Sequence, residues 1–309
     1  MRKCRVVSNS VFLFPGQGSQ FAGMGLSLAE TFSEAREIFA RADEALGFAL
    51  SKLCFEGPEE ELRLTENTQP AILTVSVAAH AVLRSRGVTA GFVAGHSLGE
   101  YSAVVAAGGL EFEDAVRLVR KRGRYMQEAV PPGVGAMAAL LKLPAGRLDT
   151  ILSEASQGEV VSAANLNSPD QVVIAGHAGA VARAMELAKA AGAKRAVALP
   201  VSAPFHCALM RPAQAKMRGE LEDVEFHDLT VPLVNNWQAR AVRSAAGVRQ
   251  GLIEQIPNPV QWVAALQLLA AEGVTSGLEV GPGSVLSGLV KQTAPSIEMA
   301  KRGEAKDFD

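Results

Sequence analysis

Short apolar runs alternate with longer stretches of helical periodicity in the first third of the chain. Residues 11–14 form an apolar run that ends at a Pro-Gly-Gln-Gly turn, and a second run, residues 91–94, is followed by glycine. The spacing of apolar residues predicts helices at 32–46, 70–86 and 100–107. Strands that alternate with helices predict an α/β domain whose sheet is covered on both faces.

The middle of the chain has a different order of elements. We expect strands at 136–141, 160–165, 171–175 and 195–201, and helices at 145–155 and 178–191. The order strand, helix, strand, strand, helix, strand is that of a ferredoxin-like unit. We therefore predict a small ferredoxin-like domain at 131–203, inserted into a larger α/β domain made of 1–130 and 204–309. The larger domain would resume with strands at 229–235 and 275–280, and a cleft between two domains is a natural place for a site.

Composition excludes several classes of function. A formal charge of -2 over 309 residues, with both signs interspersed, gives no reason to expect nucleic acid or an anionic membrane as a partner. No apolar run is long enough to span a bilayer or to form a signal-peptide core, so a cytoplasmic protein is expected. Three separated cysteines predict neither a disulfide framework nor a metal site. The Lys/Asp-rich tail after Met299 is expected to be poorly ordered.

The pentapeptide Gly-His-Ser-Leu-Gly at residues 95–99 is the strongest candidate for chemistry. It follows an apolar strand and precedes a helix, which is the arrangement of the nucleophile elbow in an α/β-hydrolase-like domain. The flanking glycines allow a sharp turn that exposes the Ser97 hydroxyl, and the N–H of Leu98 can face a developing oxyanion. The pattern indicates acyl transfer through a seryl ester, although an ordinary strand–turn–helix corner has the same sequence signature.

A serine nucleophile needs a base, and the chain has five histidines: His80, His96, His177, His206 and His227. His96 adjoins Ser97, but neighbouring side chains in a tight turn diverge, so a supporting role is expected. His80 lies on an apolar helix face, and His177 and His227 have no convergent partners. His206 stands where the inserted domain returns to the larger one, and it is the predicted base.

No carboxylate is an obvious third member of a triad. Asp223 and Asp228 follow in a suitable order but lie in polar, exposed-looking sequence. A backbone carbonyl could orient His206 instead, by accepting from its other ring nitrogen.

Arg122 falls on the apolar face of the helical pattern at 114–126, and a buried guanidinium requires an anionic partner. Two alternatives are open: a structural ion pair with a core carboxylate such as Glu100, or a bidentate clamp on a substrate carboxylate.

Six motifs in order along residues 11–292 resemble the malonyl-CoA:acyl carrier protein transacylases of type II fatty acid synthesis. They are FPGQGSQ at 14–20, GHSLGEY at 95–101, RG at 122–123, NLNSP at 165–169, HCALM at 206–210 and NPVQW at 258–262. The resemblance implies a ping-pong reaction in which Ser97, activated by His206, takes the malonyl group from malonyl-CoA. The phosphopantetheine thiol of acyl carrier protein then takes it from the serine.

The resemblance also assigns roles to residues. Arg122 would bind the malonyl carboxylate, and Gln17 with the Leu98 N–H would frame the oxyanion hole. Gln261 resembles the position whose backbone carbonyl orients the histidine. Asn165 and Asn167 match a loop of the small domain near the cleft. No metal or cofactor is implied beyond malonyl-CoA as a substrate, and nothing in the sequence calls for more than a monomer.

Phe205 departs from the serine that fatty-acid enzymes of this family often carry before the histidine. A ring at this position resembles malonyl-selective polyketide acyltransferases and is expected to exclude an α-methyl branch.

Three alternative functions remain: a discrete acyltransferase of a polyketide pathway, a serine esterase or thioesterase, and a silent module that binds carrier protein. The buried arginine and the absence of a clear triad acid disfavour the esterase. A silent module would have little reason to keep Ser97, His206 and Arg122 together.

Overall fold

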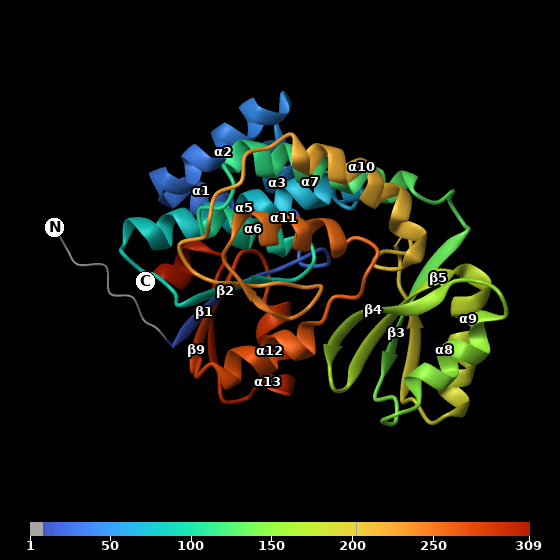
Figure 1. The fold of residues 1–309 in the computed structure, drawn as a ribbon. Coiled ribbons are helices and arrows are strands. Elements are labelled where there is room, and N and C mark those ends of the chain that lie inside the picture. Colours follow the sequence, from blue (N-terminus) through green and yellow to red (C-terminus); the bar gives the residue numbers. More distant parts are fainter. Residues whose placement is uncertain (1–8, 202) are drawn as a thin grey trace.

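The computed structural model describes residues 9–201 and 203–309, so Cys4, the basic residues near it and Ser202 lie outside the described residues. Two sheets form the framework (Figure 1). The larger sheet has the order β10-β9-β1-β2-β7-β8. Its strands are β1 (Ser10–Phe14), β2 (Phe92–Gly95), β7 (Leu233–Val234), β8 (Ala241–Val242), β9 (Ser276–Val280) and β10 (Glu298–Arg302). All pairings are parallel except that of β7 with β8.

Helices cover both faces of the larger sheet, as the alternation of strands and helices predicts (Figure 1). One layer contains α1 (Leu26–Thr31), α2 (Ser33–Leu46), α3 (Leu50–Glu56), α4 (Glu59–Leu62), α5 (Thr65–Ser85), α6 (Gly99–Ala106), α7 (Phe112–Glu128), α10 (Arg211–Glu222) and α11 (Ala245–Glu254). The opposite layer contains α12 (Trp262–Ala271) and α13 (Val285–Thr293). Along β1, Phe12 and Phe14 pack in the first core, whereas Val11 and Leu13 pack in the second. This period of two buries both faces of the strand.

The second sheet is antiparallel, with the order β4-β5-β3-β6. Its strands are β3 (Gly135–Leu141), β4 (Val161–Ser168), β5 (Gln171–His177) and β6 (Arg195–Ala198). α8 (Leu148–Ser156) and α9 (Ala178–Ala190) pack on it with a core of their own. The order of these six elements along the chain is the predicted one, and Figure 1 shows them to one side of the larger sheet.

The tail after Met299 was expected to be poorly ordered, and that expectation is wrong. β10 pairs along its whole length with β9, and a short 3-10 helix, η2 (Ala305–Phe308), follows it. Phe308 is buried against Phe32, with the Arg86 guanidinium over its ring. Backbone pairing orders an edge strand without an apolar sequence pattern, which explains why the pattern did not reveal it.

Two predicted strands are shorter in the structure. The strand expected at 229–235 is reduced to β7, because Pro232 precedes it and has no N–H to donate to a ladder. The strand expected at 195–201 ends at Ala198. Another 3-10 helix, η1 (Ala208–Met210), comes before α10.

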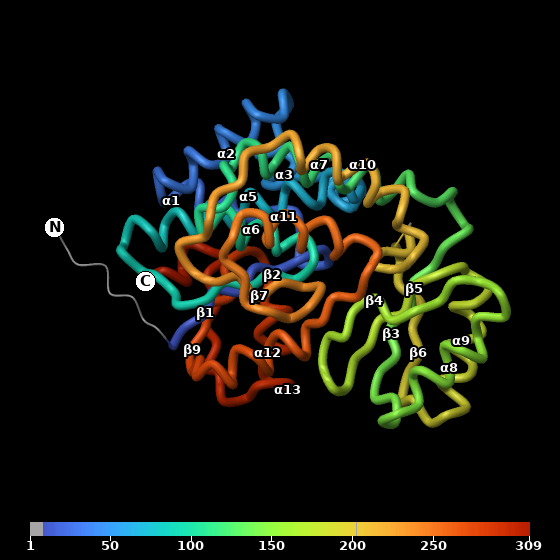
Figure 2. Tube along the Cα trace, in the orientation of Figure 1, coloured from blue at the N-terminus to red at the C-terminus, as the bar shows by residue number. Residues whose placement is uncertain are grey.

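The parallel order brings the site loops together. Phe14 at the end of β1 pairs with Gly95 at the end of β2, so the loop at 15–20 and the elbow leave the sheet side by side. Figure 2 shows β1 between segments that are distant in sequence, β2 and β9. Ligands of open α/β sheets bind beyond the carboxyl ends of such strands.

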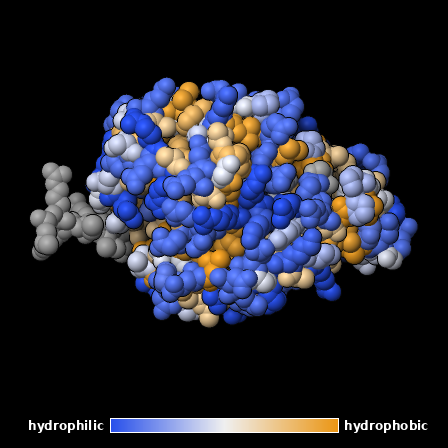
Figure 3. All heavy atoms as spheres, turned by 90° about the horizontal axis from the view of Figure 1, so that it is seen from above, coloured by the Kyte–Doolittle hydropathy of each residue, from blue (hydrophilic) through white to orange (hydrophobic). Residues whose placement is uncertain are grey.

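The outer surface of the upper helical layer is mainly hydrophilic, with apolar residues interspersed in small groups (Figure 3). Among the described helices, none has the length and apolar character required to cross a membrane.

Candidate active site

The turn between β2 and α6 holds Ser97 in a left-handed conformation, with φ of 52°. A Cβ on Gly95 would lie 1.9 Å from the carbonyl oxygen of Gly99, and a Cβ on Gly99 would lie 2.1 Å from that of Phe14. Only glycine fits at either position. The glycines of the pentapeptide therefore permit the close packing of strand, turn and helix that a nucleophile elbow requires.

The Ser97 hydroxyl lies against His206, as the sequence led us to expect. Ser97 Oγ is 2.7 Å from His206 Nε2, and His206 Nδ1 is 2.8 Å from the backbone oxygen of Gln255. A carbonyl oxygen can only accept, so Nδ1 carries the proton and Nε2 is left to accept from the serine. The imidazole is therefore arranged to take the serine proton.

His206 is 3% exposed, and it adopts a φ of 58°, so both members of the pair have left-handed backbone conformations. Burial, with a further contribution from the nearby Arg122 charge, lowers the pKa of His206 to about 3. Both effects disfavour the imidazolium. A neutral imidazole is the form in which His206 can act as a base.

Gln261 is not the residue that orients the histidine, which corrects the assignment made from the resemblance. The orienting carbonyl is that of Gln255, at the end of α11. The Gln261 carbonyl instead accepts from Ala265 N in the first turn of α12, and the Gln261 N–H donates to Asn236 O. Gln261 begins a helix, and its backbone groups are used there.

Arg122 projects from α7 into the site and is 1% exposed. Its Nη1 donates to Gln69 Oε1 at 2.8 Å, while its Nη2 donates to Gln255 Oε1 at 2.9 Å and to Ser97 Oγ at 3.1 Å. Its Nε has no hydrogen-bond partner among the described residues. The guanidinium is thus held by neutral oxygens beside the serine, with its Nε donor left unused.

Glu100 does not form the ion pair that the sequence left open. Its Oε2 accepts from Gln255 Nε2 at 3.0 Å and from Asn236 N at 3.3 Å, so Gln255 lies between the carboxyl and Arg122. Burial raises the pKa of Glu100 to about 8, which favours the neutral acid at pH 7. A buried cation without a charged partner is a site for an anionic ligand.

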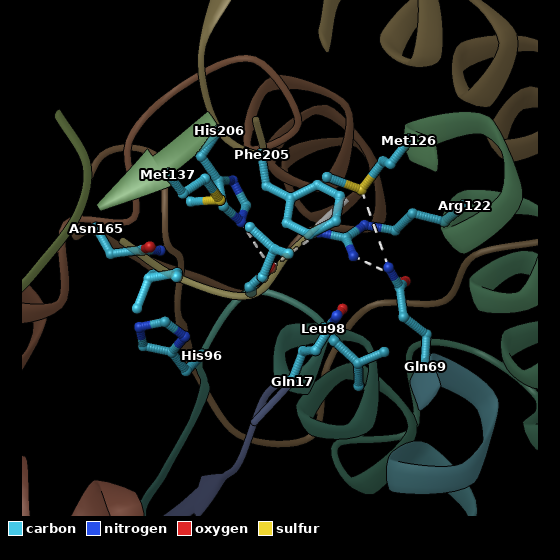
Figure 4. Close-up of a pocket in the computed structure, with 13 residues that line it drawn as sticks. Gln17, Gln69, His96, Leu98, Arg122, Met126, Met137, Asn165, Phe205 and His206 are labelled. Carbon is cyan, nitrogen blue, oxygen red and sulfur yellow. Dashed lines mark hydrogen bonds between the residues drawn. The ribbon is translucent and has the colours of Figure 1, made fainter. Parts of the chain in front are cut away.

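The serine, histidine and arginine line a pocket of about 120 Å³. Figure 4 shows Arg122 and His206 entering it from different elements, with Phe205 between them. Its apolar wall comes from both halves of the molecule and consists of Leu98, Met126, Met137, Leu199, Val201 and Phe205. The pocket adjoins a longer cleft of about 440 Å³, because the two cavities share lining residues such as Gln17 and Asn165.

Gln17 and Leu98 are the residues predicted to frame an oxyanion hole. Both line the smaller pocket, Gln17 from the loop after β1 and Leu98 from the start of α6. The Gln17 side-chain amide is engaged with Thr65 Oγ1, to which it donates at 3.5 Å. A contribution of Gln17 to an oxyanion hole would therefore come from its backbone.

Asn165 and Asn167 belong to β4 of the second sheet. Asn165 lines both cavities, whereas Asn167 lines only the longer cleft, and its Oδ1 accepts from His96 Nε2 at 2.8 Å. The His96 ring also lies edge-on to Trp262. His96 thus has the supporting position expected of it, and it links the elbow to the second sheet.

The sequence analysis did not identify three residues of the site: Gln69, Gln255 and Asn236. All three are buried, and each contacts either the elbow or Arg122. The available signal was a polar residue in an apolar context. Gln69 lies just before the apolar run of α5, and Asn236 is the second residue after the apolar end of β7. The remaining histidines lie elsewhere: His80 meets the rings of Phe12 and Phe14 edge-on, His177 accepts from Val160 N, and the His227 N–H donates to Gly109 O. In the described part of the chain, no cluster of three or more His, Cys, Asp or Glu residues could hold a metal.

Comparison with known families accounts for this arrangement. Residues 11–306 match the family model described as acyl transferase domain. The chain is 50% identical over 294 residues to the malonyl CoA-acyl carrier protein transacylase of Escherichia coli K12, with 95% of each chain covered. It is 51% identical over 287 residues to the enzyme of the same name from Bacillus subtilis, covering 93% of this chain and 90% of the other.

Solved structures agree with these relatives. An acyl carrier protein S-malonyltransferase from Vibrio cholerae superposes with a TM-score of 0.96 at 44% identity, covering 98% of this chain and 99% of the other. A malonyl-transacylase in complex with a type II PKS acyl-carrier protein gives a TM-score of 0.95 at 46% identity, covering 97% and 98%. The chain belongs to the acyl transferase family, and within it to the malonyl CoA-acyl carrier protein transacylases.

Proposed function

We propose that Ser97 carries a malonyl group from malonyl-CoA to the phosphopantetheine thiol of acyl carrier protein, with His206 as base and Arg122 as carboxylate clamp. The observation that carries the proposal is the position of Ser97 Oγ, 2.7 Å from His206 Nε2 and 3.1 Å from Arg122 Nη2. The nucleophilic oxygen thus contacts both a neutral base and a cation whose charge no carboxylate among the described residues balances.

In the first half-reaction, Ser97 Oγ attacks the thioester carbonyl while its proton passes to His206 Nε2. The negative charge that develops on the carbonyl oxygen is stabilised by the backbone N–H groups of Leu98 and Gln17. When the C–S bond breaks, His206 returns the proton to the coenzyme A thiolate, and malonyl-Ser97 remains. The carrier thiol reverses these steps: it gives its proton to His206, attacks the ester and releases Ser97 as the alcohol.

Arg122 selects the acyl group. Its charge is balanced by no carboxylate among the described residues, and its Nε has no acceptor, so the carboxylate of malonate satisfies both needs. An acetyl group leaves the buried guanidinium unpaired, which is costly. The same site needs no metal or redox cofactor, because atoms and electrons balance with one serine, one histidine and two thiols.

The finer architecture and setting are part of the same proposal. The larger sheet with its elbow supports an α/β-hydrolase-like domain at 1–130 and 204–309, and the sheet order β4-β5-β3-β6 supports an inserted ferredoxin-like domain at 131–203. One chain supplies the whole site, which favours a monomer. The unpaired thiols of Cys54 and Cys207 favour a reducing, cytoplasmic setting. Nucleic acid and membranes have no place in the reaction.

Intact-mass spectrometry after brief incubation with malonyl-CoA tests the nucleophile and the donor together. A malonyl adduct should form on the wild type and not on Ser97→Ala. Ser102→Ala is the control, because Ser102 is a nearby serine buried within α6, and it should keep the adduct. An adduct on Ser97→Ala would refute the assignment.

The fate of the adduct identifies the acceptor. Holo acyl carrier protein should discharge it, and the apo form, which has no phosphopantetheine thiol, should not. Release of free malonate at the same rate without carrier would favour the esterase instead.

The physiological carrier has two candidates. We place the enzyme in fatty acid synthesis, and a polyketide pathway is the second candidate because one structural relative is a transacylase bound to a type II PKS carrier protein. Parallel discharge assays with carriers of both classes separate them, since the partner should show the larger kcat/KM.

A further inference from the structure

The conformation of the nucleophile requires support from its surroundings. Ser97 is not a glycine, yet its φ of 52° lies in the left-handed region. Such residues persist only where neighbouring structure holds them. Ser97 has its backbone N–H and carbonyl available for that purpose, and both have partners: the N–H donates to Asn236 Oδ1 and the carbonyl accepts from Gln255 Nε2.

Asn236 makes the shorter of these contacts and a second one beside it. Its Oδ1 lies 2.6 Å from Ser97 N, and its Nδ2 lies 2.6 Å from Gly95 O. The residue is 1% exposed and does not line the pocket. One side-chain amide therefore connects the residues on either side of His96, and it does so from behind the elbow.

The position of Asn236 in the sheet explains this geometry. β7 pairs in parallel with β2 up to Ala94 and Val234, and the chain then turns away at 236–238. An amide side chain has the donor and the acceptor of a peptide group. By donating to Gly95 and accepting from Ser97, the Asn236 side chain continues the ladder where the backbone of β7 has left it.

We propose that Asn236 is a positioning residue that holds the elbow in its strained form, so that Ser97 Oγ meets His206 and the Leu98 N–H faces the oxyanion. The inference rests on the proposed role of Ser97 as nucleophile. Asn236 touches neither substrate nor the reacting atoms, and its effect passes through the backbone of Ser97.

The Asn236 backbone anchors the amide to the elements around it. Its N–H donates to Glu100 Oε2 on α6, and its carbonyl accepts from Gln261 N at the start of α12. The side chain is thus fixed relative to the strand, the turn and the helix that together form the elbow. Misplacement of a reacting atom by about 1 Å is enough to slow an enzyme on the order of 100-fold.

The test compares Asn236→Ala with Asn235→Ala in the full-length protein. Asn235 is a matched control: it is also buried, but its Oδ1 accepts from Gln238 N and Arg240 N within its own turn. We expect kcat for malonyl transfer to fall on the order of 100-fold in Asn236→Ala, with KM for malonyl-CoA within threefold of wild type. Asn235→Ala should stay within threefold in both constants. Equal losses of kcat in the two variants, or a loss confined to KM, would overturn the inference.

Asn236→Asp gives a second readout that remains informative if the alanine variant does not fold. The ionised side chain has no donor for Gly95 O, whereas the protonated acid has both a donor and an acceptor. The titratable groups around the position are Glu100 beside its backbone and, beyond Ser97, His206 and Arg122. The rate relative to wild type should rise as pH falls from 8 to 6, and a constant or falling ratio would contradict the inference. Ser97→Ala, measured in parallel, distinguishes a failure of the proposed function from a failure of this inference. If Ser97→Ala retains activity, the proposed function fails. If it is inactive, the Asn236 variants alone decide whether Asn236 positions the elbow.

Discussion

In the proposed reaction, the surroundings of Arg122 select the substrate. Because Gln69 and Gln255 offer it only neutral oxygens, we infer that the malonyl carboxylate is the charge partner of this guanidinium. Arg122→Ala removes the clamp and also the penalty for a neutral acyl group. We expect kcat/KM with malonyl-CoA to fall at least 100-fold, which is about 2.7 kcal/mol, while acetyl-CoA is used better relative to malonyl-CoA. Steady-state assays with both thioesters check this, and equal loss on the two would count against the clamp.

The low pKa of His206 has a consequence for activity. An exposed histidine would lose its basic form below its usual pKa of 6.5, whereas His206 titrates near 3. The pH profile of kcat/KM should therefore stay level from pH 7 to pH 5. An inflection near 6.5 assigned to the free enzyme would disprove this.

The same shift acts on stability with a defined sign. Below pH 6.5 the unfolded chain takes up a proton at this residue and the folded chain does not, so the unfolding free energy decreases as pH falls toward 3. Circular dichroism at each pH therefore has to accompany the rate measurements.

Phe205 tests how closely the pocket fits its acyl group. It is 9% exposed and lines the wall beside Ser97, where an α-methyl branch would need room. Phe205→Ser should raise the kcat/KM for methylmalonyl-CoA relative to that for malonyl-CoA about tenfold, the effect of a methyl-sized space. Competition between the two thioesters measures the ratio, and an unchanged ratio would remove Phe205 from the selection of substrate.

At the scale of the element, the turn between β2 and α6 depends on glycine. Gly95→Ala would place a Cβ 1.9 Å from a backbone oxygen, so the turn must open. We expect a large drop in the thermal midpoint and loss of the malonyl adduct. Gly219→Ala is the control, because nothing lies within 4 Å of its Cβ position in α10, and it should stabilise the protein by about 1 kcal/mol. A Gly95→Ala protein with the stability of wild type would show that the turn tolerates a side chain.

The sequence predicts the elements well where apolar periodicity determines them. β1, β2, α2 and α6 occur close to their expected bounds, whereas α5 begins five residues before the expected start at Pro70. Ser97 and His206 come together, although their catalytic roles stay predictions. Gln261 was assigned a contact that Gln255 makes, because the path of the loop before α12 depends on tertiary packing rather than on spacing. Asn236 was missed for a related reason: a polar residue after a strand has the sequence signature of an ordinary turn.

At the scale of the whole molecule, the C-terminal segment forms the edge strand β10 of the larger sheet and the short helix η2 after it. Phe308 is 5% exposed and packs with Phe32 and Arg86, far from the pocket. Phe308→Ala should lower the free energy of unfolding by about 3 kcal/mol and leave kcat at 25 °C unchanged. Denaturant unfolding measures the free energy of unfolding, and the malonyl transfer assay measures kcat. Val88→Ala, at a 37% exposed position, is the control, and an equal effect of both changes would mean that the tail contributes little.

The small volume of the pocket around Ser97 sets an upper limit on what the enzyme can carry. Ligand pockets for drug-sized molecules hold roughly 300–1,000 Å³, whereas this one holds about 120 Å³. A three-carbon acid fits such a space, and a long aliphatic tail does not. A long acyl chain on Ser97 would have to extend into the adjoining cleft, so we expect long-chain thioesters to acylate the serine poorly.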